Sequence, residues 1–80
     1  MTPAQCRAAR ALLNLEQADV ADRAGVARAT LIDFEKGQRV PRETTVSAIR
    51  AALEAAGVVF LSENGGGPGV RLKKGKHDGE

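Results

Sequence analysis

A tight turn between two short helix-forming segments constrains this chain more than any other feature of its sequence. The turn is centred on Gly25, between a helix predicted over 17–24 and another predicted over 28–36. Glycine adopts the positive φ angle that such a turn needs, because it has no Cβ atom. Ala21 supplies a small side chain where the two helices must approach each other closely. This spacing predicts a pair of helices joined by a sharp turn.

The helix after the turn is expected to bury one face and to expose the other. Its 3.6-residue period turns Leu31, Phe34 and Glu35 toward the core. The residues that face outward form a strip, which we name the outer strip: Arg28, Ala29, Ile32, Asp33 and Lys36. An isoleucine is unusual on a solvated helix face, although an ordinary amphipathic helix with one stray apolar residue is the alternative interpretation.

The chemistry of the outer strip suits the edges of base pairs. Ile32 and Ala29 fit contact with thymine methyl groups. Arg28 is suited to hydrogen bonding with guanine, and Asp33 is suited to accepting from the amino group of cytosine. The outer strip is therefore a candidate surface for reading double-stranded DNA.

Two further helices are predicted on either side of this pair. Thr2 and Gln5 form a capping box around Pro3, and this helix stops at Asn14. The fourth helix begins near position 43 or 44 and is closed by Gly57. Four short helices with tight connections predict a compact, mainly α fold.

The period of the sequence changes after the fourth helix. The runs 58–62 and 70–73 are β-prone and flank a glycine-rich stretch, which predicts a β-hairpin with a long loop. The glycine cluster lacks the lysine and hydroxyl residue of a phosphate-binding loop, so a flexible loop is the better interpretation. We expect a DNA-binding domain over 1–57, a hairpin over 58–74 and a flexible tail over 75–80.

Length, charge and composition narrow the class of protein. Eighty residues form one domain, and so short a chain gains much from a partner chain. The net charge is only +2, but cations without acids gather over 36–42 and over 71–76. The only aromatic residues are Phe34 and Phe60, which disfavours binding of single strands or RNA through stacked bases.

The same composition disfavours other classes of function. Cys6 is the only cysteine and His77 the only histidine, so neither a metal site nor a paired nucleophile and base can be assigned. We expect no enzyme, no cofactor and no metal. The sequence shows no signal peptide and no long apolar run, so we expect a cytoplasmic protein that does not enter a membrane and lies on the nucleoid when bound to DNA.

The segment 15–37 resembles the helix-turn-helix of Cro and phage repressors, the XRE family. The resemblance rests on the spacing of Ala21, Gly25, Leu31, Glu35 and Gly37 and extends over about 2–56. It implies a four-helix, repressor-like fold and a bacterial or phage transcriptional regulator. It also implies a homodimer that binds a palindromic operator, with the third helix of each chain in the major groove.

The resemblance also assigns roles to individual residues. Arg10 and Glu35 match a family salt bridge between the first and third helices. Glu16 and Ala27 stand where relatives carry better helix caps. The base-reading positions are Arg28, Ala29, Ile32 and Asp33. The positions expected to meet DNA phosphates are Gln17, Thr30, Lys36, Gln38, Arg39 and Arg42.

The hairpin leaves three roles open. An isolated two-stranded hairpin is marginal in water, so its apolar residues need a surface. We favour dimerisation with a second chain, through an interface made of Val59, Phe60, Leu61 and Leu72. The alternatives are packing against its own helices, and a wing in which Arg71, Lys73 and Lys74 contact DNA. An alternative function is that of an antitoxin-type protein that neutralises a partner protein and binds its own operator.

Overall fold

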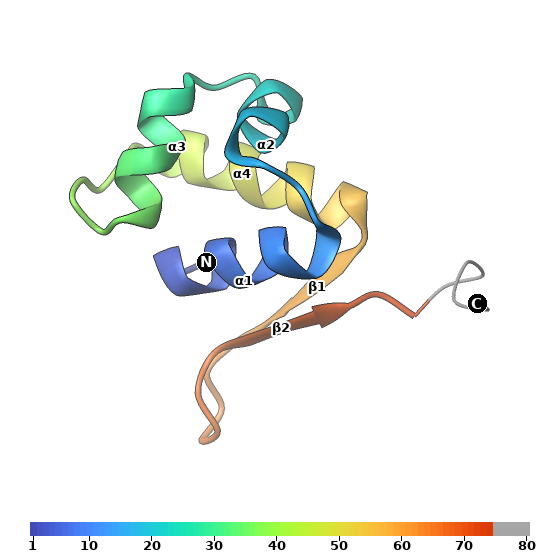
Figure 1. Cartoon of the computed structure of the whole chain (residues 1–80). Helices are drawn as coiled ribbons and strands as arrows, with labels where there is room; N and C mark the ends of the chain where they lie inside the picture. Colours follow the sequence, from blue (N-terminus) through green and yellow to red (C-terminus); the bar gives the residue numbers. More distant parts are fainter. Residues whose placement is uncertain (75–80) are drawn as a thin grey trace.

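Four helices are followed by one antiparallel hairpin in a computed structural model that describes residues 1–74 (Figure 1). The elements are α1 (Pro3–Leu13), α2 (Gln17–Ala24), α3 (Arg28–Glu35), α4 (Glu43–Ala56), β1 (Val58–Leu61) and β2 (Gly69–Leu72). The mainly α fold with a C-terminal hairpin is therefore confirmed. The tail expected over 75–80 lies outside the described residues.

The helices begin and end at the residues that local signals indicate. The Thr2 hydroxyl accepts from the Gln5 N–H at 3.0 Å, and the Gln5 side chain accepts from the Thr2 N–H at 2.8 Å, which completes the capping box. Gly25 ends α2 with φ 69°, a conformation that strains residues with a side chain. At the start of α2, the Asp19 carboxylate accepts from the Glu16 N–H at 3.1 Å.

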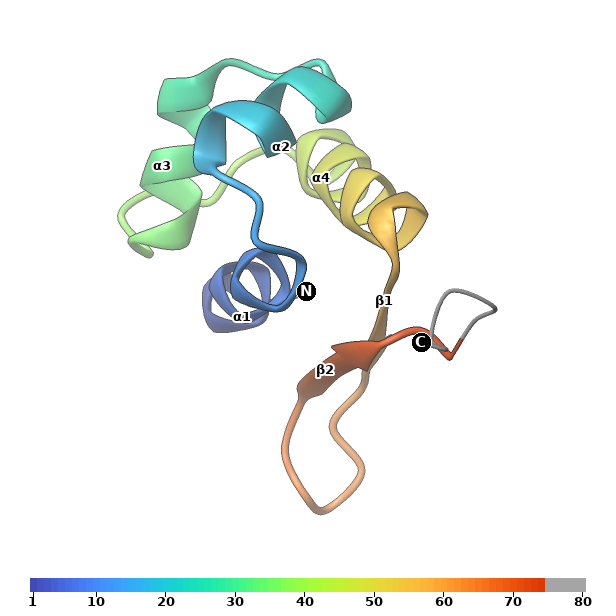
Figure 2. The same ribbon diagram turned by 45° about the vertical axis from the view of Figure 1, so that its right-hand side comes forward.

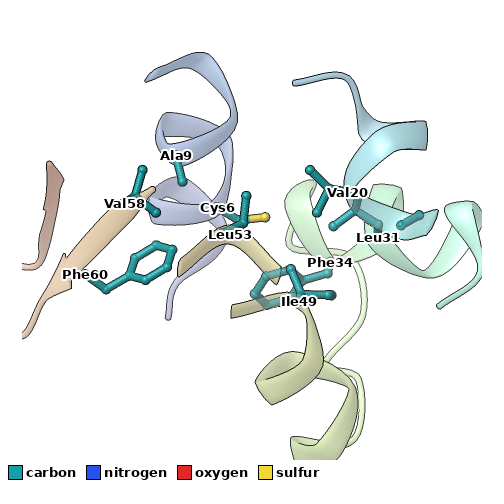
Figure 3. Close-up of a cluster of buried hydrophobic side chains, with 10 residues drawn as sticks. Cys6, Ala9, Val20, Leu31, Phe34, Ile49, Leu53, Val58 and Phe60 are labelled. Carbon is teal, nitrogen blue, oxygen red and sulfur yellow. The ribbon is translucent and has the colours of Figure 1, made fainter. Parts of the chain in front are cut away.

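The core is formed by side chains from all four helices and from β1 (Figure 3). Ala21 is buried between α2 and its neighbours, as its small side chain predicts. The buried apolar side chains are Cys6, Ala9, Val20, Ala21, Leu31, Phe34, Ile49, Leu53, Val58 and Phe60. Because α2 and α3 contribute to the same cluster as α1 and α4, the turn between them is held rigidly in place.

The hairpin packs on its own chain through one face. Both views place α1 between the hairpin and the α2–α3 pair (Figures 1 and 2). Val58 pairs with Leu72 and Phe60 with Val70, so these four side chains share a face of the sheet. Phe60, expected in an interface with a second chain, is only 8% exposed within its own core. It therefore offers little surface to a partner, and packing on its own helices accounts for this face.

A buried glutamine fixes the position of the hairpin. The Gln5 side-chain amide donates to the Leu61 carbonyl at 3.1 Å and to the Gly69 carbonyl at 2.7 Å. Leu61 and Gly69 face each other at the end of the ladder next to the glycine-rich loop. The residue that caps α1 thus also ties the loop end of the hairpin to α1, and the sheet cannot swing away without losing both hydrogen bonds.

Candidate nucleic-acid interface

The outer strip lies on the exposed side of α3, as its period predicts. Leu31, Phe34 and Glu35 on the opposite face are buried. Arg28, Ala29 and Lys36 are exposed, and Ile32 and Asp33 are half-buried. The five residues are therefore placed together on one side of a helix whose other side is anchored in the core.

Arg28 has no structural role that the described residues reveal. It is the first residue of α3, where Ala27 provides no side-chain cap and the first turn contains no acid. A cation at a helix N-terminus faces the positive end of the helix dipole, which is unfavourable by about 0.3–1 kcal/mol. Within residues 1–74, the ion pairs are Arg10–Glu35 and Arg50–Glu54, so Arg28 forms no ion pair. Its guanidinium donors are free to bind a ligand.

Glu35 is the centre of a buried hydrogen-bond network that holds α3 against α1 and α2. Its side chain is 2% exposed and receives the Arg10 guanidinium at 2.7 and 2.8 Å in a bidentate pair. The Gln17 amide donates to it at 2.9 Å, and the Cys6 thiol donates at 3.1 Å. Arg10 also donates to the Leu15 carbonyl at 3.2 Å, which ties in the α1–α2 connection. The start of α2 and the end of α3 are thereby fixed to each other.

The network sets the protonation states of its members. Burial alone would raise the pKa of Glu35, but the hydrogen bonds from Arg10, Gln17 and Cys6 outweigh it and lower that pKa. Burial, and then the hydrogen bond to Glu35, raise the pKa of the Cys6 thiol. The hydrogen bond to Glu35 raises the pKa of Arg10. Glu35 is therefore an anion that accepts from a neutral thiol and a cationic guanidinium.

Three of the groups that contact Glu35 could not be assigned to it from the sequence alone. Gln17 is a candidate for phosphate contact, yet one of its amide N–H groups is directed at Glu35. Cys6 is a hydrogen-bond donor within the core as well as a small apolar residue. The exposed Arg7 donates to the main-chain carbonyl of Glu35 and so caps the C-terminal end of α3. Only the folded chain brings these groups to one residue.

An open pocket of about 520 Å³ joins the outer strip to the start of α2. Its lining includes Arg10, Asn14, Gln17 and Arg28, so side chains from α1, α2 and α3 meet there. Glu16 also lines it and adds a negative charge. The pocket thus continues the polar surface of α3 toward the residue expected to touch a phosphate.

The loop between α3 and α4 extends the same surface with cations. Lys36, Gln38, Arg39 and Arg42 are all exposed, and none of these three cations forms an ion pair within the described part of the chain. Thr30 is half-buried on α3. Val40, at 95% exposure, is the most exposed large apolar side chain in the region 1–74. The structure places a basic loop directly after the outer strip.

Acid should weaken the fold through Glu35. A carboxylate whose folded pKa lies below its ordinary value of 4.5 stabilises the protein above that value, and the contribution is lost as the pH falls through the folded pKa. We expect the free energy of unfolding to decline below about pH 4.5 in urea titrations run between pH 7 and 3. Glu35→Gln should be less stable than the wild type at pH 7, and its free energy of unfolding should decline less steeply as the pH falls. An equal acid dependence in both proteins would contradict this role of Glu35.

The geometry defines a class of protein. Two helices meet at a sharp turn, the second presents polar and apolar groups to solvent, and a basic loop follows. This is the arrangement of a helix-turn-helix DNA-binding domain.

Comparison with known families agrees with this class. A family model described as helix-turn-helix matches residues 7–56, which is more than half of the chain. The chain belongs to this XRE-type, Cro/repressor-like helix-turn-helix family, whose members are DNA-binding transcriptional regulators. No curated protein sequence matches the chain. None of the helices in the region 1–74 has the length and hydropathy needed to cross a bilayer.

Proposed function

We propose that this protein regulates transcription by binding a palindromic operator as a homodimer, with α3 of each chain in the major groove. The observation that carries the proposal is the outer strip, which presents an exposed arginine without an ion pair, beside a half-buried carboxylate and a half-buried isoleucine, on a helix anchored in the core. A helix with these groups fits the major groove, where base edges offer partners for each of them. Arg28, Ala29, Ile32 and Asp33 are the proposed base-reading residues.

Phosphate contacts would set the position of the helix in the groove. The exposed cations Lys36, Arg39 and Arg42 follow α3 along the chain and have no acidic partner in residues 1–74. Gln17 keeps one amide N–H for a phosphate while the other is bound to Glu35. We include Thr30 and Gln38 in this set, because α3 and its following loop place them beside the outer strip. Such contacts fix orientation but carry no sequence information.

The second chain is proposed to bind at the exposed part of the hairpin. Leu72 is 52% exposed and Leu61 is 38% exposed, and Val59 lies on the same outer face of the sheet as Leu61. Large apolar side chains exposed on neighbouring strands are typical of association surfaces. The interface that we propose consists of Val59 and Leu61 on the outer face of the sheet and of Leu72 at the exposed end of the opposite face, without Phe60.

Leu72→Asp should convert dimers into monomers in sedimentation equilibrium. A carboxylate in an apolar two-fold interface is desolvated in both chains at once, and the two charges repel. Val40→Asp is the matched control, because it places the same charge on an exposed apolar residue of a loop. If Val40→Asp yields monomers and Leu72→Asp does not, the interface lies at the α3–α4 loop and the hairpin assignment fails.

Selection of bound duplexes from a random pool tests the proposed function directly. We expect a palindrome whose half-sites are centred about 34 Å apart, one helical turn of DNA. A single unrepeated site would overturn the dimeric mode of binding. If titration at low ionic strength detected no complex with any duplex, the whole proposal would fail.

A further inference from the structure

A groove of about 360 Å³ lies between α1 and β2, on the loop side of the hairpin. Its walls include Ala4 and Ala8 from α1, and Pro68 and Val70 from the hairpin. Ala4 and Ala8 are both exposed, and Leu12, four residues further along the same side of α1, is 41% exposed. The exposed side of a helix ordinarily carries polar residues, so this side of α1 is an apolar surface that the described part of the chain leaves uncovered.

The open edge of β2 borders this groove. Lys73 donates to the Gly57 carbonyl at 2.7 Å, and Val58 lies opposite Leu72 in the same antiparallel ladder. Successive residues of such a ladder turn their N–H and C=O groups alternately toward and away from the partner strand. The backbone groups of Leu72 and Val70 therefore point away from β1, toward an edge where residues 1–74 supply no further strand. An open edge of this kind can pair with the strand of another chain.

Cations without acidic partners follow the groove along β2 and the residues after it. Arg71, Lys73 and Lys74 are exposed and form no ion pair in residues 1–74. Neither α1 nor β2 contains an acidic residue. The acid that precedes β2 along the chain is Glu63, and its carboxylate accepts from two N–H groups of its own loop at 3.1 and 3.0 Å. The groove therefore presents positive charge to a partner and favours acidic side chains.

We propose that the groove binds an extended, acidic segment of another protein, which joins the sheet as a third strand beside β2. The backbone of this segment pairs with the open edge of β2. Its side chains alternate between the two faces of the sheet, so apolar ones lie over Ala4 and Ala8 while acidic ones face Arg71 and Lys73. In this mode of recognition, main-chain hydrogen bonds give affinity and alternate side chains give specificity. The partner is a protein, so the proposal adds a function to DNA binding.

Two other occupants fit the groove less well. A second copy of β2 would bring Arg71 and Lys73 of both chains onto one face of a joint sheet, where like charges are unfavourable. DNA bound along the outer strip would be separated from the groove, because α1 lies between the hairpin and the α2–α3 pair (Figures 1 and 2). The dimer interface proposed above consists of Val59, Leu61 and Leu72, and none of these side chains lines the groove.

A designed peptide tests this proposal on the full-length chain. The probe is a short fluorescein-labelled peptide of alternating valine and glutamate, and its binding is followed by fluorescence anisotropy. We expect micromolar binding that weakens as salt is added. A peptide of alternating valine and lysine, and a valine–glutamate peptide with two central prolines, should not bind, because the first has the wrong charge and the second lacks strand donors. Hydrogen exchange of the Val70 and Leu72 amides, measured by NMR, should slow when the peptide is bound.

Two variants assign the binding to the groove. Ala8→Glu should weaken peptide binding by at least about tenfold, because its side chain occupies the groove and its charge repels the acidic peptide. Ala55→Glu is the matched control, since it places the same charge on an exposed alanine of α4 and should change the affinity by less than about twofold. Unfolding curves of both variants verify that the fold is intact, and both should bind the operator as the wild type does.

Three results would overturn the proposal. If the Val70 and Leu72 amides became protected with rising protein concentration and without peptide, a second copy would occupy the edge. If they became protected on addition of the operator duplex, the edge would belong to the DNA interface. If the valine–glutamate peptide did not bind, or bound Ala8→Glu as tightly as the wild type, the groove would not be a site for an acidic strand. Operator binding is measured separately with duplexes, so each of these failures is distinguishable from a failure of the proposed function.

Discussion

Arg10→Met is expected to lower the free energy of unfolding by about 3 kcal/mol. The substitution leaves the Glu35 carboxylate buried at 2% exposure without the cation that forms two of its hydrogen bonds. Removing one partner of a buried ion pair is typically unfavourable by about 3–5 kcal/mol. Arg10 is itself 21% exposed, so water can partly replace it and the lower end of that range applies.

This loss is large for so small a domain. Eighty residues at about 0.05–0.15 kcal/mol per residue give a total stability of roughly 4–12 kcal/mol. The variant should therefore be partly unfolded at temperatures where the wild type is fully folded. Urea titration followed by circular dichroism measures the difference.

A surface pair in the same chain provides the control for this experiment. Arg50 and Glu54 form an ion pair one turn apart on α4, and both are exposed. Glu54→Gln removes this pair but keeps Arg50 over the ring of Phe60, 5.5 Å from its centroid. We expect a change of at most about 0.5 kcal/mol. Similar losses of unfolding free energy in Arg10→Met and Glu54→Gln would show that the buried network stabilises the fold no more than an ordinary surface ion pair does.

Arg28→Ala is expected to weaken operator binding by about 5- to 150-fold, which corresponds to about 1–3 kcal/mol for one bidentate contact with a base. Binding to random DNA should change much less, so the preference at one base pair of each half-site should relax. Titrations of the selected operator and of a scrambled duplex at one salt concentration measure both effects.

The same variant should keep or slightly increase its stability. Arg28 is a cation at the uncapped start of α3, and alanine removes that charge from the positive end of the helix dipole. Weaker operator binding together with unchanged or higher stability would identify Arg28 as a residue retained for binding. A loss of stability would instead indicate that Arg28 supports the fold.

Arg42→Ala is the matched comparison for Arg28→Ala, because it also removes an exposed arginine. A phosphate contact carries no sequence information, so the affinity of the variant for the operator and for the scrambled duplex should fall by the same factor. The slope of log K against log salt concentration should fall by about 0.9 for each phosphate that the variant no longer neutralises. An operator-specific loss in Arg42→Ala would move this residue from the phosphate set to the base-reading set.

Much of the fold was predictable from local signals. The capping box at Thr2, the left-handed residue Asn14 and the turn at Gly25 are each decided by residues within about four positions of one another. The division of α3 into a buried face and the outer strip follows from helical period in the same way. Such features depend on short-range sterics and hydrogen bonds, which a sequence displays directly.

The pairing of Arg10 with Glu35 was suggested by resemblance to a family, and the structure contains it. The other partners of Glu35 were not suggested. Cys6 is 29 residues from Glu35 and Gln17 is 18 residues away, and neither has a local pattern that marks it as a hydrogen-bond donor to a distant carboxylate. Their convergence follows from how α1 and α2 pack on α3.

The sequence by itself therefore determined the helices, the turn between α2 and α3, and the residues that α3 turns outward. Only the tertiary structure decided that Phe60 lies inside its own core, that Gln5 reaches residues 56 and 64 positions away, and that three elements share one buried carboxylate. The physical reason is the range of the interactions. Caps and helical period act within one turn of a helix, whereas burial and long-range hydrogen bonds exist only once the elements have packed together.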